Sequence, residues 1–67
     1  MSKEIIRHIQ ATILHKNTVS LHVQVKNKTG FLRVAAIELL QDFNSISTGD
    51  IVPIRVPLWH LELMKLA

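Results

Sequence analysis

The sequence contains no cysteine, which excludes disulfide bonds and cysteine-ligated zinc sites. It is also short, with 67 residues, a length at which a single hydrophobic core contributes little net stability. Natural domains of this size usually add a staple or a partner. We therefore predict one domain over residues 1–67 that is stabilised by forming a homo-oligomer. The lack of cysteine also fits a cytoplasmic protein.

Long hydrophobic runs are missing as well. No apolar stretch approaches the roughly 20 residues that a membrane-spanning helix requires. Arg7, His8 and Gln10 interrupt the apolar residues near the N-terminus, so we expect no signal peptide and no membrane span. The apolar fraction of 48% argues against disorder. The net charge of +3 comes from scattered residues and permits an anionic partner without requiring one.

Apolar and polar residues alternate in two segments near the N-terminus. Residues 5–15 carry apolar side chains mainly at odd positions, and residues 19–26 repeat this pattern more regularly. A period of two over this length predicts half-buried strands. The enrichment in Val, Ile and Thr agrees with that prediction.

Residues 15–18 lie between these segments and read as a hairpin turn. Opposite residues of an antiparallel pair share a face of the sheet, so odd positions must pair with odd positions. The turn then needs an odd number of residues, such as 16–18, or a bulge. With a three-residue turn, Ile13 lies opposite Leu21.

The segment from residue 31 to residue 43 has two interpretations. Its apolar residues recur at helical spacing, which predicts one helix over 31–43. Residues 31–37 also suit a buried strand that leads into a short helix over 38–43, where Glu, Leu and Gln favour the helix. Gly30 ends a turn in front of either structure.

The last third contains a polar loop and a strand with two prolines. Residues 44–50 form the loop, and Val52, Ile54 and Val56 then fall on one face of a strand. Pro53 and Pro57 cannot donate to a ladder, so this strand is an edge strand or is interrupted. After Pro57 the apolar phase changes, which indicates a bend or bulge before a last strand, or a final helical turn within 58–66.

Four histidines are candidate ligands of a metal ion: His8, His15, His22 and His60. Zinc requires three or four ligands that converge. In the expected hairpin, His22 lies opposite Thr12, and His8 is about 13 Å further along that strand. We therefore predict no metal site.

Catalytic machinery is equally sparse. A nucleophile needs a base and an orienting group, and no Gly-x-Ser-x-Gly turn is present. The five carboxylates are far apart in the sequence, and 67 residues can hardly enclose a substrate. The sequence therefore predicts a protein that is not an enzyme.

Two turns offer backbone N–H groups and hydroxyls that can hold a small oxyanion. The candidate anion-binding residues in these turns are Lys28, Thr29, Gly30, Ser47 and Thr48.

A basic rim around the first two turns is the alternative, as a nucleic-acid site. It consists of Lys16, Lys26, Lys28 and Arg33. The aromatic residues Phe31, Phe43 and Trp59 all fall in apolar patterns, so we expect them in the core and not on a stacking surface.

One arrangement resembles a known family. A hairpin is followed by a segment ending in a short helix, then by residues 46–52 with the sequence Ile-Ser-Thr-Gly-Asp-Ile-Val, and by a last strand ending at 61–63. Over residues 9–63 this pattern is similar to the TOBE family, small OB-like domains that include the molybdate-binding molbindins. The resemblance implies an oligomer that holds oxyanions between its subunits.

The chain departs from the molbindin pattern at three places. Ser2, Arg7 and His8 only loosely match the opening segment, and residues 34–37 lack the expected serine. Pro57 stands where the family has a lysine, with Arg55 two residues earlier, which adds Arg55 to the candidate anion-binding residues.

Together these observations predict a mainly β fold, a small antiparallel OB/TOBE-like barrel with one short helix. The alternative is an α+β fold in which a β-hairpin is followed by a helix and a strand. Three functions stay open. The first is a non-catalytic, TOBE-like module that binds an oxyanion such as molybdate or tungstate at subunit contacts. The second is a nucleic-acid-binding small β-barrel, and the third is a protein-interaction adaptor or regulatory subunit.

Overall fold

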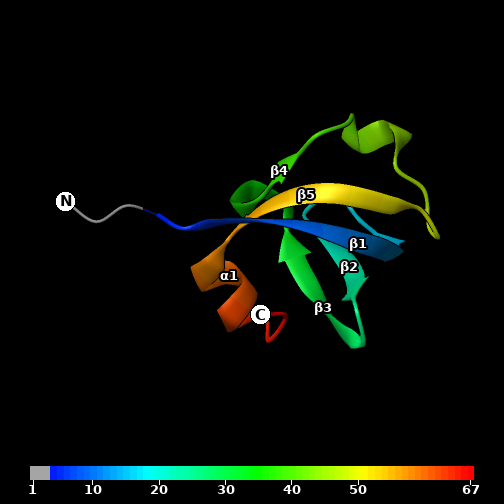
Figure 1. The fold of residues 1–67 in the computed structure, drawn as a ribbon. Coiled ribbons are helices and arrows are strands. Elements are labelled where there is room, and N and C mark those ends of the chain that lie inside the picture. The colour runs from blue at the N-terminus through cyan, green and yellow to red at the C-terminus, as the bar shows by residue number, and fades with distance from the viewer. Residues whose placement is uncertain (1–3) are drawn as a thin grey trace.

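The computed structural model describes residues 4–67, which form one antiparallel sheet of five strands and a short C-terminal α-helix (Figure 1). The elements in chain order are β1 (Ile6–Lys16), β2 (Ser20–Val25), β3 (Lys28–Arg33), β4 (Glu38–Leu39), β5 (Ile51–Pro57) and α1 (Leu58–Leu63), with single 3-10 turns at Val34–Ala36 and Phe43–Ser45. The prediction of a mainly β fold with one short helix is confirmed. Ser2, from the family comparison, lies outside the described residues.

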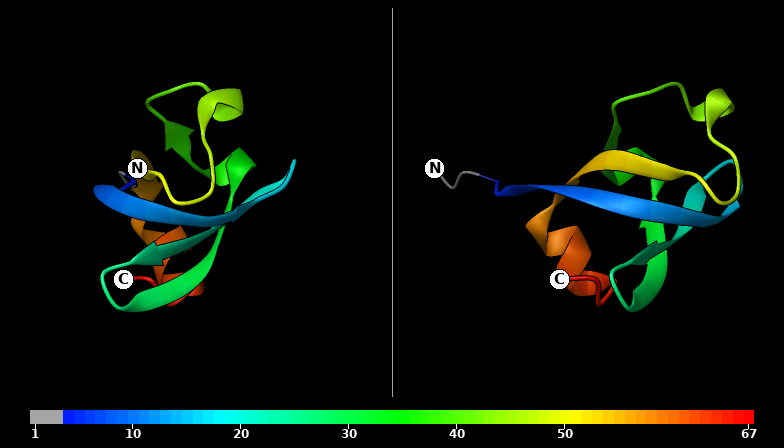
Figure 2. Two further views of the ribbon diagram at one scale, coloured as in Figure 1. Left: turned by 90° about the vertical axis from the view of Figure 1, so that its right-hand side faces the viewer. Right: turned by 45° about the vertical axis from the view of Figure 1, so that its right-hand side comes forward.

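The strands are arranged in the order β3-β2-β1-β5-β4. β1, β2 and β3 follow one another, and β5 returns through a long connection to lie beside β1, which is a Greek-key arrangement. The β2–β3 hairpin crosses the direction of β1 and β5 at a steep angle (Figure 2). β3 and β4 form the two edges, and within residues 4–67 no pairing between them closes the sheet.

β1 is the longest strand, and it pairs with β5 on one side and with β2 on the other. Its pairing with β5 is continuous from Ile6 opposite Pro57 to Thr12 opposite Ile51. Its pairing with β2 begins only at Thr12 and continues to Lys16. Residues 6–10 of β1 therefore have a paired neighbour on one side only.

A bulge in the β1–β2 hairpin keeps the apolar residues of both strands on the same face of the sheet. Ile13 lies opposite Val23, and the register shifts between Ile13 and His15, so the expected pairing of Ile13 with Leu21 is wrong. The physical reason is Asn17, whose side-chain oxygen accepts N–H bonds from residues 19 and 20 at 2.9 Å each. These bonds hold a tight turn of even length, and the bulge restores the apolar phase.

The segment 31–43 contains no α-helix, so both the helix over 31–43 and the short helix over 38–43 are wrong. Leu32 belongs to β3 opposite Leu21, and a 3-10 turn leads directly to β4. Glu38 and Leu39 then pair with Arg55 and Ile54 of β5. Ladder bonds and burial outweigh the local helix propensity here.

The α-helix lies instead directly after β5, where Leu58 begins it. The final-turn interpretation of residues 58–66 is thus correct for 58–63, and no sixth strand forms there. None of the helices among residues 4–67 is both long enough and apolar enough to cross a membrane.

Neither proline of β5 removes a hydrogen bond from the β1–β5 ladder. Ile13 donates to the carbonyl of Asp50 and Leu58 donates to that of Ile5, both at 2.8 Å, so odd residues of β1 bond to β5. Pro53 and Pro57 lie opposite even residues of β1, and their nitrogens point away from it. β5 is an internal and uninterrupted strand, so the prediction of an edge or interrupted strand is wrong. Its outer side has few donors, which keeps β4 to two residues beside Arg55.

The core lies on the concave face of the sheet. It contains Ala11, Ile13, Leu21, Val23, Val25, Leu32, Ile46, Val52, Ile54, Val56, Leu61 and Leu66. The predicted face of Val52, Ile54 and Val56 is confirmed. Phe31 and Trp59 were expected in the core but are each 52% exposed, because both lie on surfaces that point away from it. Phe43 packs against the core and is partly buried.

Candidate functional site

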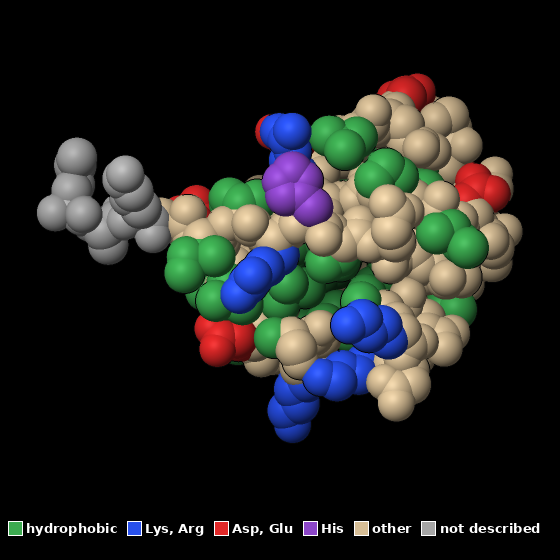
Figure 3. Space-filling view, viewed as in Figure 1, with side chains coloured by type: hydrophobic (Ala, Val, Ile, Leu, Met, Phe, Trp, Pro, Cys, Tyr) green, Lys and Arg blue, Asp and Glu red, His purple; other side chains and the backbone are tan. Residues whose placement is uncertain are grey.

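A groove of about 560 Å³ runs between the first half of β1, the β2–β3 hairpin and α1. Its apolar lining comes from Ile9, Val25, Leu58, Leu61 and Leu66. Its polar lining comes from Arg7, His8, Gln10, Lys26 and Lys28, with Ala67 at one end. Figure 3 shows this hollow with hydrophobic side chains at its floor and Lys and Arg side chains around it.

The groove exists because β1 continues where β2 has already ended. Lys26 adopts a positive φ of 57° and turns the chain into the hairpin directly after Val25. The hairpin therefore leaves residues 6–10 of β1 uncovered. Pro57 ends β5 and directs α1 beneath this gap, so that Leu61 and Leu66, 3% and 5% exposed, form its floor.

Gly30 allows the C-terminal residues to approach the sheet closely. A Cβ at this position would lie 2.9 Å from the carbonyl oxygen of Met64 and 3.1 Å from Cγ of Leu66. The contact keeps Leu66 at the groove floor, and the carbonyl of Ala67 accepts a hydrogen bond from Nζ of Lys28. Sequence reasoning assigned Gly30 to a turn, whereas it lies within β3 and serves packing.

The rim of the groove is positively charged. Arg7, Lys26 and Lys28 are all exposed, and no acidic side chain among residues 4–67 lines the groove. Among residues 4–67 the only ion pair joins Arg55 to Glu38, which lies elsewhere. Lys28 is engaged with Ala67, whereas no ion pair among residues 4–67 involves Arg7 or Lys26. Cations around an apolar floor attract an anionic group that carries an apolar part.

The six candidate anion-binding residues fall into three separate places. Lys28 is on the groove rim, with Thr29 and Gly30 following it on β3. Ser47 and Thr48 lie in the loop before β5, where the carboxylate of Asp50 already accepts the N–H of Ser47 at 2.9 Å. The predicted residues therefore do not form one site within a single chain, since β2 and β1 separate β3 from β5.

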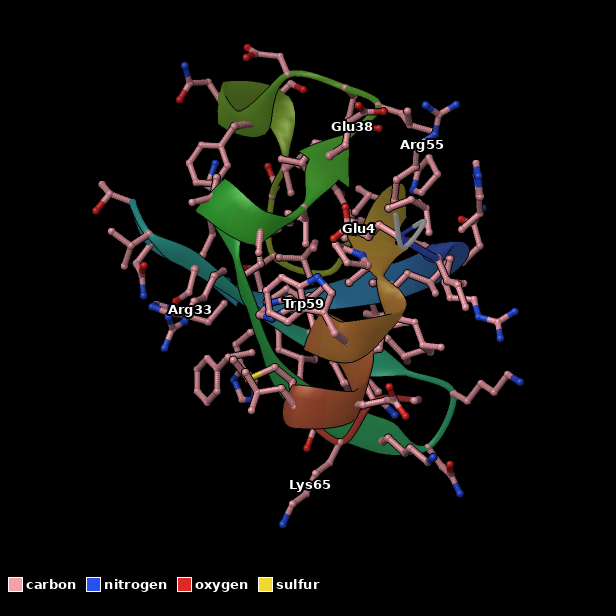
Figure 4. All side chains as sticks on the ribbon, turned by 90° about the vertical axis from the view of Figure 1, so that its left-hand side faces the viewer. Glu4, Arg33, Glu38, Arg55, Trp59 and Lys65 are labelled. Atoms are coloured by element: carbon pink, nitrogen blue, oxygen red, sulfur yellow. The ribbon has the colours of Figure 1, made fainter. Side chains whose placement is uncertain are left out.

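Arg55, the remaining anion candidate, forms an ion pair with Glu38 at 2.8 Å. Figure 4 shows these two side chains together, well away from Arg33. They line a second, more open hollow of about 400 Å³ together with Glu4. The two carboxylates balance the charge of Arg55, so this hollow offers an anion little attraction.

The four nucleic-acid candidates are divided as well. Lys16 is held inside the fold, because its ammonium group donates to the carbonyls of Phe43 and Ile46 at 3.1 and 2.7 Å. Lys26 and Lys28 lie together on the groove rim. Arg33 is at the opposite end of β3, about 16 Å from Lys28 along the strand.

The exposed aromatic residues do not line the groove. Phe31 stacks on His22 with ring centroids 4.5 Å apart, and both belong to the β2–β3 pair. Trp59 donates its indole N–H to Glu4 at 2.7 Å. Bases stacked on aromatic rings are a common feature of single-strand binding sites, and no Phe or Trp among the described residues lines the groove.

Among the histidines, His60 is the only one that is fully buried. Its Nε2 accepts the backbone N–H of Arg33 at 3.0 Å, which places the ring proton on Nδ1, and Nδ1 has no partner. Burial, and then the charge of Arg33, lower the pKa of His60 below its usual value of 6.5. His60 thus has a structural role, joining α1 to β3.

The other histidines do not converge on a metal-sized site. His15 lies opposite His22, so the expected pairing of His22 with Thr12 is wrong. Within residues 4–67 no three side chains of His, Cys, Asp or Glu are close enough to hold a metal ion together.

Arg7 and the floor of α1 are the parts of the groove that sequence reasoning missed. A signal for Arg7 was present, because it is a cation on the odd, apolar phase of β1. A charged residue in that phase indicates an uncovered stretch of the concave face. The floor had no comparable signal, since the direction of α1 depends on tertiary packing.

Comparisons with family models, curated proteins and solved structures found no match to this chain.

Proposed function

We propose that this protein is a small, non-catalytic binding module whose ligand site is the groove beside β1. The proposal is supported chiefly by one observation: three cations, Arg7, Lys26 and Lys28, surround an apolar floor that no acidic side chain lines. The ligand therefore combines a negatively charged group with an apolar part. In this proposal the protein acts through binding alone.

We further propose that the curled sheet is a small, partly open barrel of the OB/TOBE kind, with the opening between β3 and β4. Its Greek-key order and the shared strand β1 support this interpretation. Under the TOBE hypothesis the module forms a homo-oligomer in the cytoplasm. An oxyanion such as molybdate then binds at subunit contacts.

The two ligand chemistries can be separated with simple probes. Anilinonaphthalene sulfonate is an apolar anion whose fluorescence rises in an apolar site, whereas molybdate and sulfate lack an apolar part. We expect saturable fluorescence with one dye per chain and a melting temperature that rises with dye concentration. Molybdate supports the TOBE hypothesis if it raises the melting temperature to the same extent at equal concentration.

Charge-matched variants locate the binding site. Arg7→Gln removes one cation from the rim, and Arg33→Gln removes one cation outside the groove, so both change the net charge equally. We expect dye affinity to fall several-fold in the first variant and to stay unchanged in the second. Equal losses in both variants, or the absence of saturable binding in the folded protein, would refute the groove as the site.

A further inference from the structure

The uncovered stretch of β1 presents unused backbone hydrogen-bonding groups to the groove. Odd residues from Ile5 to Ile13 direct their N–H and C=O groups to β5, as the two bonds at 2.8 Å at the ends of this ladder show. In an antiparallel strand the even residues then point the other way. Those of His8 and Gln10 face the groove, which both residues line.

The prolines of β5 independently support this orientation of the backbone N–H and C=O groups of β1. Gln10 lies opposite Pro53 and Ile6 lies opposite Pro57, and a proline can provide no N–H to β1. Within residues 4–67, no hydrogen bond reaches the backbone groups of His8 or Gln10 on the groove side. The ladder that β2 makes with β1 ends at Thr12, immediately before this stretch.

We propose that the groove binds an extended, acidic peptide segment of another protein, which adds a strand to β1 along residues 6–10. This inference rests on the proposed function, because it assigns a partner to the same groove. The added strand occupies the side of β1 that β2 leaves free, and five residues of β1 offer about 16 Å of edge. Strand addition of this kind takes affinity from main-chain bonds and specificity from alternate side chains.

The lining of the groove defines the sequence of the peptide. Arg7 and Ile9 share one face of β1, so the peptide residues opposite them are separated by one residue. The residue opposite Arg7 is acidic, and the residue opposite Ile9 is apolar and rests on Leu61 and Leu66. Lys26 and Lys28 add attraction from the other side of the groove and favour further acidic residues.

Two capped pentapeptides serve as probes, Thr-Glu-Thr-Leu-Thr for a parallel strand and Thr-Leu-Thr-Glu-Thr for an antiparallel one. We expect one of them to bind and to slow amide hydrogen exchange at His8 and Gln10, as measured by NMR. The same peptide methylated on alternate backbone nitrogens is the control, since it keeps the side chains and loses the main-chain donors. Its affinity is expected to be at least about tenfold lower.

Two variants of one residue test the backbone directly. His8→Pro removes the N–H that faces the groove and no bond of the β1–β5 ladder, since His8 lies at a position that does not bond to β5. His8→Ala removes the same side chain and keeps the N–H. We expect peptide affinity to fall about tenfold in the first variant and to change less than about twofold in the second. Circular dichroism checks that both are folded.

The outcomes separate this inference from the proposed function. If the dye binds in an Arg7-dependent way while neither peptide protects His8 and Gln10, strand addition is refuted and the binding module stands. If neither the dye nor a peptide binds, both proposals are refuted. If size measurement shows a dimer that protects the same two amides without peptide, a second copy occupies the edge and the peptide proposal is refuted.

Discussion

The ring of His60 accepts a hydrogen bond from the backbone N–H of Arg33, with 3.0 Å between the two nitrogens. This bond joins α1 to the last residue of β3, 27 positions earlier in the chain. The N–H of Arg33 points to the open side of β3, since the next residue, Val34, donates back toward β2 by bonding to Val19. His60 thus covers an edge donor and holds α1 beneath the groove.

Acid is expected to weaken the fold through His60. Its pKa is lowered in the folded protein by burial, and then by the charge of Arg33, from the usual value of 6.5. Between the lowered pKa and 6.5, the unfolded chain binds more protons, so stability rises with pH in this window. The contribution is fully present above pH 6.5 and is lost as pH falls through the lowered pKa. Urea midpoints measured across this range test the prediction.

His60→Leu provides the control for the acid effect. The leucine fills a similar volume but leaves the N–H of Arg33 without its acceptor, so we expect a loss of about 1–3 kcal/mol at neutral pH. The acid-dependent step attributed to His60 should vanish in this variant. A step of unchanged size in His60→Leu would show that other groups cause it.

Gly30→Ala is expected to displace the C-terminal residues. The added Cβ meets the carbonyl oxygen of Met64 at 2.9 Å and the side chain of Leu66 at 3.1 Å, and overpacking of this kind costs about 1–3 kcal/mol. Thr29→Ala, at an exposed neighbouring position, should change stability by less than about 0.5 kcal/mol. Denaturant titration of both variants measures the difference, and equal effects would exclude the steric explanation.

A double-mutant cycle identifies the partner of that clash. Leu66→Ala removes the side-chain part of the contact and leaves the Met64 carbonyl in place. We expect Gly30→Ala to cost less in the Leu66→Ala background, because contacting residues are energetically coupled. Additive losses would assign the whole cost to the backbone carbonyl.

Lys16→Met is expected to loosen the connection between β4 and β5. The methionine keeps the apolar stem but loses the ammonium group, which bonds to the carbonyls of Phe43 and Ile46 and lies 4.9 Å from the centre of the Phe43 ring. The expected loss is about 1–2 kcal/mol, with faster amide exchange at Ile46. Lys26→Met, at an exposed rim position, should leave stability nearly unchanged. Similar losses in both variants would contradict this role for Lys16.

The strands that alternate regularly were predictable because one buried face imposes a period of two. Ala11 and Ile13 of β1, the odd residues of β2 and the even residues of β5 are buried as that period requires. The segment 34–45 was not predictable, because its helical spacing competes with pairing to β5, and only the position of Arg55 between two prolines resolves that competition. Part of the groove was also predictable, because Lys26 and Lys28 were recognised as basic residues beside a turn. The position of α1 was not predictable.

The sequence by itself determined a mainly β fold with alternating strands, since alternation, prolines and turn residues act locally. It also determined the parity of the hairpin, although Asn17 decided that a bulge, and not a longer turn, would satisfy it. Only the tertiary structure decided that β1 extends beyond the end of β2 and that α1 lies beneath the uncovered stretch of β1. The tertiary structure also places Arg7, Lys26 and Lys28 on one rim. These features join residues far apart in the chain, and their energy comes from burial and pairing that no local pattern encodes.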